Sequence, residues 1–174
     1  ANIYYLKGKY KESIDKSIQA DRLDPKSPDN LSNIANCYFK LGHLETSKKY
    51  YSRVLNLNPY DYNGNLNMGM INLNQGNLYE AEEYLKKALA LELDNVNIWI
   101  NLAKIELKRK NSFLAKNYLM PVYSIDSQNP EYYYILGQID KLNENYSDAK
   151  ENFKKALQLK PDYKQAQDAL RGLN

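Results

Sequence analysis

The chain has 174 residues and a net charge of +3, and charged side chains make up 26% of it. No apolar run approaches the roughly 18 residues of a membrane span, and the first ten residues lack the apolar core of a secretory signal. We therefore expect a soluble, cytoplasmic protein without membrane insertion. Residues 60–95 carry two Lys or Arg against six Asp or Glu, and this acidic block disfavours a nucleic-acid partner.

The same residue types recur every 34 positions along the chain. Gly8, Gly42 and Gly76 share this spacing, and so do Ala81, Ala115 and Ala149. A fixed period of this length is typical of repeat proteins. One frame without insertions fits the whole chain as a partial unit 1–27, full units 28–61, 62–95, 96–129 and 130–163, and a final segment 164–174.

Apolar residues in each full unit follow two stretches of helical spacing that are separated by a turn. A proline such as Pro161 ends the second stretch, since it cannot continue the hydrogen-bond ladder. Together these signals predict helices at 11–23, 29–41, 45–57, 63–75, 79–91, 97–109, 113–125, 131–143, 147–159 and about 164–172. Pro121 lies inside the helix expected at 113–125, where it predicts a kink.

The turn inside each unit is predicted from position 15, which is Gly8, Gly42 or Gly76 in the first three units. A left-handed glycine commonly ends a helix. In the two later units we expect Asn111 and Asn145, which lie near the same turn, to tolerate that conformation.

Both ends of the chain interrupt the frame. Ala1 falls at unit position 8, inside what should be a first helix, so we expect the chain to be a fragment of a longer protein. The partial unit would expose apolar surface that could pair with a second copy, giving a homo-oligomer. Residues 164–174 are expected to form a terminal capping helix with one apolar face.

The repeat resembles the tetratricopeptide pattern, a 34-residue helix–turn–helix unit with Trp-x-x-Leu-Gly-x-x-Tyr, Ala-x-x-x-Phe and a closing Pro. The matching residues are Trp99, Leu102, Ala103, Tyr133, Leu136, Gly137, Ala149, Phe153, Ala156 and Pro161. The departures are Asn65 at the Trp position, Asn72, Glu106 and Asp140 at the Tyr position, and Leu93 and Ser127 at the closing Pro. The resemblance implies an all-α fold, a right-handed superhelical α-solenoid forming one domain over 1–174. An irregular helical bundle is the alternative, but a bundle needs no strict period.

In this family the first helix of each unit lines a concave groove through positions 2, 5, 6, 9, 12 and 13. The resemblance therefore implies a partner-binding set of Asn33, Asn36, Asn63, Leu66, Asn67, Met70, Asn97, Ile100, Asn101, Lys104, Tyr134 and Gln138. Position 6 is Asn33, Asn67 and Asn101 in three successive units. A side-chain amide can pair with both groups of a peptide bond, so this column could hold an extended backbone. The alternative is that Asn is simply abundant on solvated helices of this chain.

Some family members bind chaperone tails through a carboxylate clamp that needs three cations. The corresponding residues here are Ser32, Asn36, Asn67, Asn97 and Asn101. All three cations are missing, and a terminal carboxylate would lose its charge-assisted hydrogen bonds. We therefore do not expect a chaperone C-terminal tail as the partner.

The remaining chemistry-bearing residues have structural interpretations. His43 is expected in a solvated turn and Cys37 in a packed helix, without the neighbours that a catalytic base or reactive thiol requires. We expect no metal and no cofactor. Lys108, Arg109 and Lys110 form the densest basic cluster, which would stabilise a helix C-terminus first and contact a partner second.

The sequence therefore predicts a non-catalytic protein–protein interaction scaffold that binds a peptide or partner segment in the concave groove. A regulatory or targeting domain of a larger enzyme or multiprotein complex is the alternative. RNA binding by a related helical repeat is disfavoured by the 34-residue period and the acidic middle.

Overall fold

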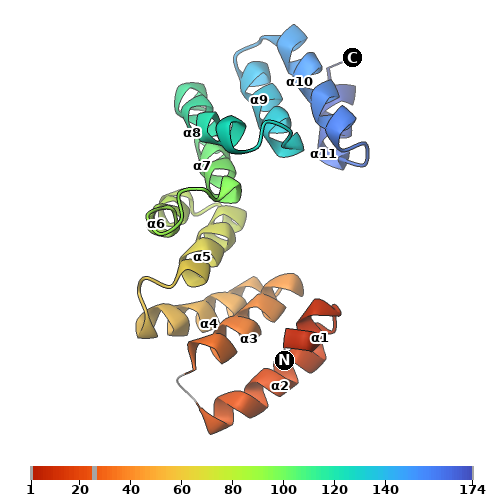
Figure 1. Ribbon diagram of the computed structural model, residues 1–174. Helices are drawn as coiled ribbons and strands as arrows, with labels where there is room; N and C mark the ends of the chain where they lie inside the picture. The colour runs from red at the N-terminus through yellow and green to blue at the C-terminus, as the bar shows by residue number, and fades with distance from the viewer. Residues whose placement is uncertain (1, 25–26, 174) are drawn as a thin grey trace. The chain divides into compact units, whose positions relative to one another are not determined.

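The computed structural model describes residues 2–24 and 27–173, so Ala1, Pro25, Lys26 and Asn174 lie outside it. Over the described residues the chain forms eleven helices and no strand (Figure 1). They are α1 (Asn2–Leu6), α2 (Tyr10–Leu23), α3 (Pro28–Lys40), α4 (Leu44–Leu57), α5 (Tyr62–Gln75), α6 (Leu78–Leu89), α7 (Val96–Lys108), α8 (Ser112–Ile125), α9 (Pro130–Leu142), α10 (Tyr146–Leu159) and α11 (Lys164–Arg171). Each predicted helix begins and ends within two residues of its prediction.

Two compact units divide the chain, residues 1–92 with α1 to α6 and residues 93–174 with α7 to α11. Within each unit, consecutive helices pair along the chain, as α3 with α4 and α9 with α10 (Figure 1). No helix among residues 2–24 and 27–173 is long and apolar enough to cross a membrane.

The first helix of each full unit starts at a capping side chain in the same repeat position. The caps are Ser27, Asp61, Asn95 and Asn129, and each accepts a hydrogen bond from a backbone N–H in the first turn. Such caps satisfy N–H groups that have no partner inside the helix. The 34-residue period thus fixes the start of these helices as well as their spacing.

In each full unit the helix pair packs a small residue at unit position 8 against a large one at position 24. The pairs are Ala35 with Tyr51, Gly69 with Leu85, Ala103 with Leu119, and Gly137 with Phe153. All four large side chains are fully or almost fully buried. A Cβ on Gly137 would lie 2.6 Å from Cε1 of Phe153, so the small residue is what allows the two helices to approach closely.

Another repeated contact joins each of the helices α5, α7, α9 and α11 to the loop before it. A side chain at unit position 4 donates a hydrogen bond of 2.8–3.1 Å to the backbone carbonyl six residues earlier. The donors are Asn65, Trp99, Tyr133 and Gln167, and the acceptors are Pro59, Leu93, Ser127 and Pro161. Four different side chains thus make the same hydrogen bond in their own units. The contact is kept even where Asn65, Leu93 and Ser127 depart from the family pattern.

The turn inside each pair corrects one sequence expectation. Position 15 has a positive φ in all five units, at Gly8, Gly42, Gly76, Lys110 (φ 60°) and Glu144 (φ 63°). Asn111 and Asn145 do not take the left-handed conformation; each is the residue before a second helix, and Asn111 caps α8 by accepting from the Leu114 N–H. The expectation was wrong because the position in the frame, and not the tolerance of the side chain, determines the backbone conformation.

Helix α8 contains Pro121 and still runs from Ser112 to Ile125. Proline has no N–H to donate, so the turn at Pro121 lacks one helical hydrogen bond. The helix nevertheless continues through Pro121 without a break, and the predicted kink stays a prediction.

Candidate functional site

The first helices of the full units, α3, α5, α7 and α9, carry the residues expected to meet a partner. In the unit of residues 1–92, helix α3 presents Asn33 and Asn36, both half-buried. Oδ1 of Asn36 accepts a hydrogen bond of 2.5 Å from the hydroxyl of Tyr51. Tyr51 is fully buried, and this burial raises the pKa of its hydroxyl above the ordinary value. Asn36 therefore satisfies a core hydroxyl, while Asn33 lies one turn earlier on the same helix.

Helix α5 presents an exposed Asn63 and half-buried Leu66, Asn67 and Met70. Nδ2 of Asn67 donates to the Asn63 carbonyl at 2.9 Å, one turn earlier. The amide of Asn67 keeps its oxygen and its second N–H for other partners. Amide and apolar groups therefore lie side by side on this helix.

In the unit of residues 93–174, helix α7 divides its expected site residues between core and surface. Asn97 is exposed, and Asn101 is 9% exposed. Ile100 is 1% exposed and packs in a core cluster with Leu119 and Ile135. The structure leaves Ile100 no surface for a ligand, because its bulky neighbours enclose it.

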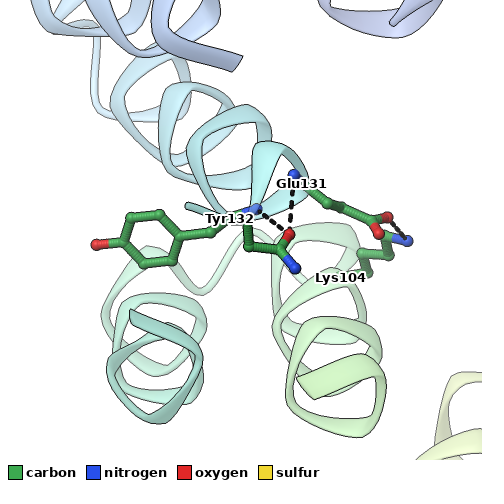
Figure 2. A network of polar contacts seen from close by, with 4 residues as sticks. Lys104, Glu131 and Tyr132 are labelled. Carbon is green, nitrogen blue, oxygen red and sulfur yellow. Dashed lines mark hydrogen bonds and ion pairs between the residues drawn. The ribbon is translucent and has the colours of Figure 1, made fainter. Parts of the chain in front are cut away.

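Lys104 joins α7 to α9 through an ion pair with Glu131 (Figure 2). Glu131 lies in the first turn of α9, where Asn129 caps the helix by accepting from the N–H groups of Glu131 and Tyr132. In Figure 2 the Tyr132 ring projects to the opposite side from the ion pair. Both partners of the pair are about one-third exposed, so it forms part of the unit's surface.

Tyr134 and Gln138 lie on α9, and both are half-buried. The Tyr134 ring centre lies 5.9 Å from that of Phe153 and 5.2 Å from that of Tyr163. The pKa of Tyr134 is raised by burial, and a side-chain hydrogen bond with Gln138 offsets only part of this rise. Tyr134 is thus partly held in the core and keeps a surface for contact.

An open hollow of about 470 Å³ lies where α7 and α9 end and α10 begins. It is lined by Leu107, Lys108, Gln138, Lys141, Leu142, Glu144 and Tyr146. We call these residues the α7–α9 hollow. Only Gln138 was among the predicted site residues. The family resemblance places unit positions 12 and 13 on the groove, and these positions are Leu107, Lys108, Lys141 and Leu142. Nothing in the sequence pattern predicted that Tyr146 would lie beside them.

Two residues with reactive side chains have structural surroundings. Cys37 is fully buried, and burial raises the pKa of its thiol. His43 is exposed, immediately before α4, with its ring centre 6.1 Å from that of Tyr38. No group of three or more His, Cys, Asp or Glu that could hold a metal ion occurs in residues 2–24 and 27–173.

Comparison with family models decides the family of this chain. Models of the tetratricopeptide repeat match residues 1–42, 28–61, 62–95 and 130–163, which together make up most of the sequence. The chain belongs to the tetratricopeptide-repeat family. The fold of this tetratricopeptide-repeat protein is therefore the helix-pair repeat that the sequence predicted.

Solved structures show the same fold at low identity. The chain is similar to MamA at 18% identity and a TM-score of 0.78, and the match covers 92% of this chain and 87% of the MamA chain. It is similar to YrrB, a tetratricopeptide-repeat protein with an unusual peptide-binding site (17%, TM-score 0.78), covering 98% and 88%. It also resembles a chain of the APC/C hetero-tetramer Cut9–Hcn1 (17%, TM-score 0.86), covering 98% of this chain but 34% of that one. No curated protein matches the sequence.

Proposed function

We propose that this tetratricopeptide-repeat protein is a non-catalytic interaction scaffold that holds a peptide or an extended segment of a partner protein against its first helices. The observation that carries the proposal is the surface of α5, where Asn63 and Asn67 lie beside Leu66 and Met70. Amides can pair with a peptide backbone, and adaptable side chains such as Met accept varied apolar groups. This combination suits a peptide better than a small polar ligand.

The likeness to YrrB supports the proposal at the level of the fold, because YrrB has a peptide-binding site. A repeat scaffold of the same fold offers the same kind of surface to a peptide, while the residues on it decide which peptide binds. In this chain we assign the backbone contacts of the first compact unit to Asn33 and Asn67; Asn101 holds the same repeat position in the second compact unit.

The proposal is tested by capturing partners on the immobilised chain from an extract of the cells that produce it. Asn33→Ala with Asn67→Ala should lower the yield of each captured partner about tenfold, since two hydrogen bonds are lost. Asn101→Ala alone should have a smaller effect because that side chain is largely buried. Asn56→Ala with Asn117→Ala, on exposed positions of the second helices α4 and α8, is the matched control. Equal capture by all variants with unchanged circular dichroism would refute the assignment of the amides.

A targeting or regulatory role within a larger assembly is the second candidate. The likeness to the Cut9 complex favours it, because a run of repeats the size of this chain spans about a third of one chain of that structure. Affinity purification of the endogenous protein tests this candidate. A constant stoichiometry with other subunits through gel filtration would support it, whereas recovery of the protein with only exchangeable partners would support the free scaffold.

A further inference from the structure

The α7–α9 hollow combines an apolar floor with a cationic rim. Leu107 is half-buried, Leu142 is 36% exposed and Tyr146 is 55% exposed, so three apolar groups face the opening. Lys108 ends α7, and Lys141 lies in the last turn of α9. Exposed apolar side chains enclosed by charged ones are typical of interaction sites.

The side-chain charges that line the hollow do not cancel. The nearby cations Lys104 and Arg109 are paired with Glu131 and Glu106, the latter at 2.6 Å between Nη1 and Oε1. Lys108 and Lys141 have no ion-pair partner within residues 2–24 and 27–173.

Among the charged side chains that line the hollow, the lysines outnumber Glu144 by two to one. Glu144 opposes the lysines with one negative charge, and the backbone at the C-terminal ends of α7 and α9 adds about half a negative charge each. A flanking carboxylate would therefore meet two lysine side chains on the rim against one glutamate.

We propose that the α7–α9 hollow binds an acidic peptide segment that carries one apolar side chain. The apolar side chain would enter between Leu107, Leu142 and Tyr146, and flanking carboxylates would meet Lys108 and Lys141. This inference rests on the proposed scaffold function and names the class of segment that this part of it binds. A nucleic acid would use the lysines but gain nothing from the leucine floor, which is why the observations favour a peptide.

Fluorescence anisotropy with synthetic peptides on the full chain tests the inference. The probe is a labelled peptide with one leucine between glutamates. Two matched peptides replace the leucine with serine or the glutamates with lysines. We expect the serine peptide to bind about tenfold more weakly, since the buried apolar group is lost. The lysine peptide should not bind measurably, and affinity for the glutamate probe should fall as salt screens its charges.

Variants of the hollow locate the binding. Lys108→Glu with Lys141→Glu should weaken the glutamate probe about tenfold or more, because two attractions become repulsions. Leu142→Ser should weaken it about fivefold through the smaller apolar floor. The control is Lys154→Glu with Lys155→Glu, which changes the net charge by the same amount as the double variant of the hollow. Both residues lie on α10 and line a different hollow, so this control should leave the affinity nearly unchanged. Circular dichroism shows whether each variant is folded, and Lys108→Gln is a milder substitute for a variant that is not.

Three results would overturn the inference: equal binding of the glutamate and serine peptides, equal weakening by the α10 control, or displacement of the probe by a single-stranded oligonucleotide at similar concentration. These results are separable from failure of the scaffold proposal. If partner capture still depends on Asn33 and Asn67 while the acidic probe does not bind, only the inference about the hollow falls.

Discussion

Lys110 and Glu144 occupy a backbone conformation that glycine adopts in the first three units. The left-handed conformation costs an ordinary L-residue about 1–2 kcal/mol because its Cβ crowds the following carbonyl. An added Cβ at Gly8, Gly42 or Gly76 meets no other group within 4 Å. The cost at Lys110 and Glu144 therefore arises in the backbone itself and not from contacts with neighbours.

Replacing either residue with glycine should stabilise the protein. Lys110→Gly and Glu144→Gly should each raise the free energy of unfolding by about 1 kcal/mol, the relief of strain less the entropy that glycine adds to the unfolded chain. Urea denaturation measures the change. Lys154→Gly, inside helix α10, is the control and should lose about 1 kcal/mol. A loss of stability at all three positions would show that Lys110 and Glu144 are not strained.

Asp140 links stability to pH. The pKa of its carboxyl is raised by burial. The hydrogen bond that Asn152 donates to Oδ2 at 2.7 Å offsets only part of this rise. Because the folded-state pKa lies above the unfolded value, the folded state favours the protonated acid. That contribution is complete below the unfolded pKa and is lost as the pH rises through the folded pKa, so ionised Asp140 opposes folding at neutral pH.

Asp140→Asn should therefore raise the free energy of unfolding at pH 7, and the gain should vanish below about pH 3, where both forms are neutral. Urea titrations at the two pH values measure it. Asp15→Asn, on an exposed position of α2, should change stability by less than about 0.5 kcal/mol at either pH. An equal gain at both pH values would mean that shape, and not charge, explains the effect of Asp140→Asn.

At the scale of single residues, the repeat frame predicts location better than exposure. The small residues Ala35, Gly69, Ala103 and Gly137 recur every 34 positions, and the structure finds each packed against a large partner. The frame placed Ile100 on the binding face, where the bulk of Leu119 and Ile135 buries it. Exposure depends on the size of neighbours from other helices, and a position number does not contain that information.

Close packing within a helix pair is most demanding at Gly137. Alanine would gain about 1 kcal/mol of helix propensity there, but its Cβ would lie 2.6–3.1 Å from three ring carbons of Phe153. The ring is fully buried and cannot move aside freely. Overpacking of this kind costs about 1–3 kcal/mol.

Gly137→Ala should thus lower the free energy of unfolding by about 1 kcal/mol, the overpacking cost less the gain in helix propensity, measured by thermal or urea denaturation. The double variant with Phe153→Leu should destabilise less than the sum of the two single changes, since the smaller side chain makes room for the methyl group. Strict additivity would contradict the packing explanation.

Helix α8 differs from the other second helices at Pro121, where the equivalent residues are Gln19, Arg53, Lys87 and Lys155. Pro121→Lys restores a backbone donor and should raise the free energy of unfolding by about 2–3 kcal/mol. Lys155→Pro in α10 is the mirror-image control and should lose about 3 kcal/mol. Unfolding curves for the two variants that shift in the same direction would show that side-chain packing at Pro121 outweighs the missing hydrogen bond.

Element boundaries were predictable because their determinants are local. The apolar spacing, the period and the closing prolines place every predicted helix within two residues of the helix observed. The hydrogen bond from unit position 4 was not predictable, since Asn65, Trp99, Tyr133 and Gln167 share no side-chain chemistry except a donor. A motif defined by residue type identifies Trp99 and Tyr133 among them, but neither Asn65 nor Gln167.

The whole molecule consists of two compact units, and the sequence does not mark their division at residues 92 and 93. A strict period predicts equal relations between all neighbours, so it carries no information on where compact units divide. It does predict how stability is distributed. In a repeat protein each helix pair interacts with its neighbours only, and the free energy is approximately a sum of local terms.

Native-state hydrogen exchange of two matched core variants tests this distribution. Phe153→Ala and Tyr51→Ala remove fully buried side chains from the same repeat position, one in each unit. Each cavity should cost about 3–5 kcal/mol, but the loss should be local. We expect faster exchange of amides in α9 and α10 for Phe153→Ala, with α3 and α4 unchanged, and the reverse for Tyr51→Ala. Exchange that accelerates equally in all helices of both variants would instead indicate one cooperative core, as in an ordinary globular domain.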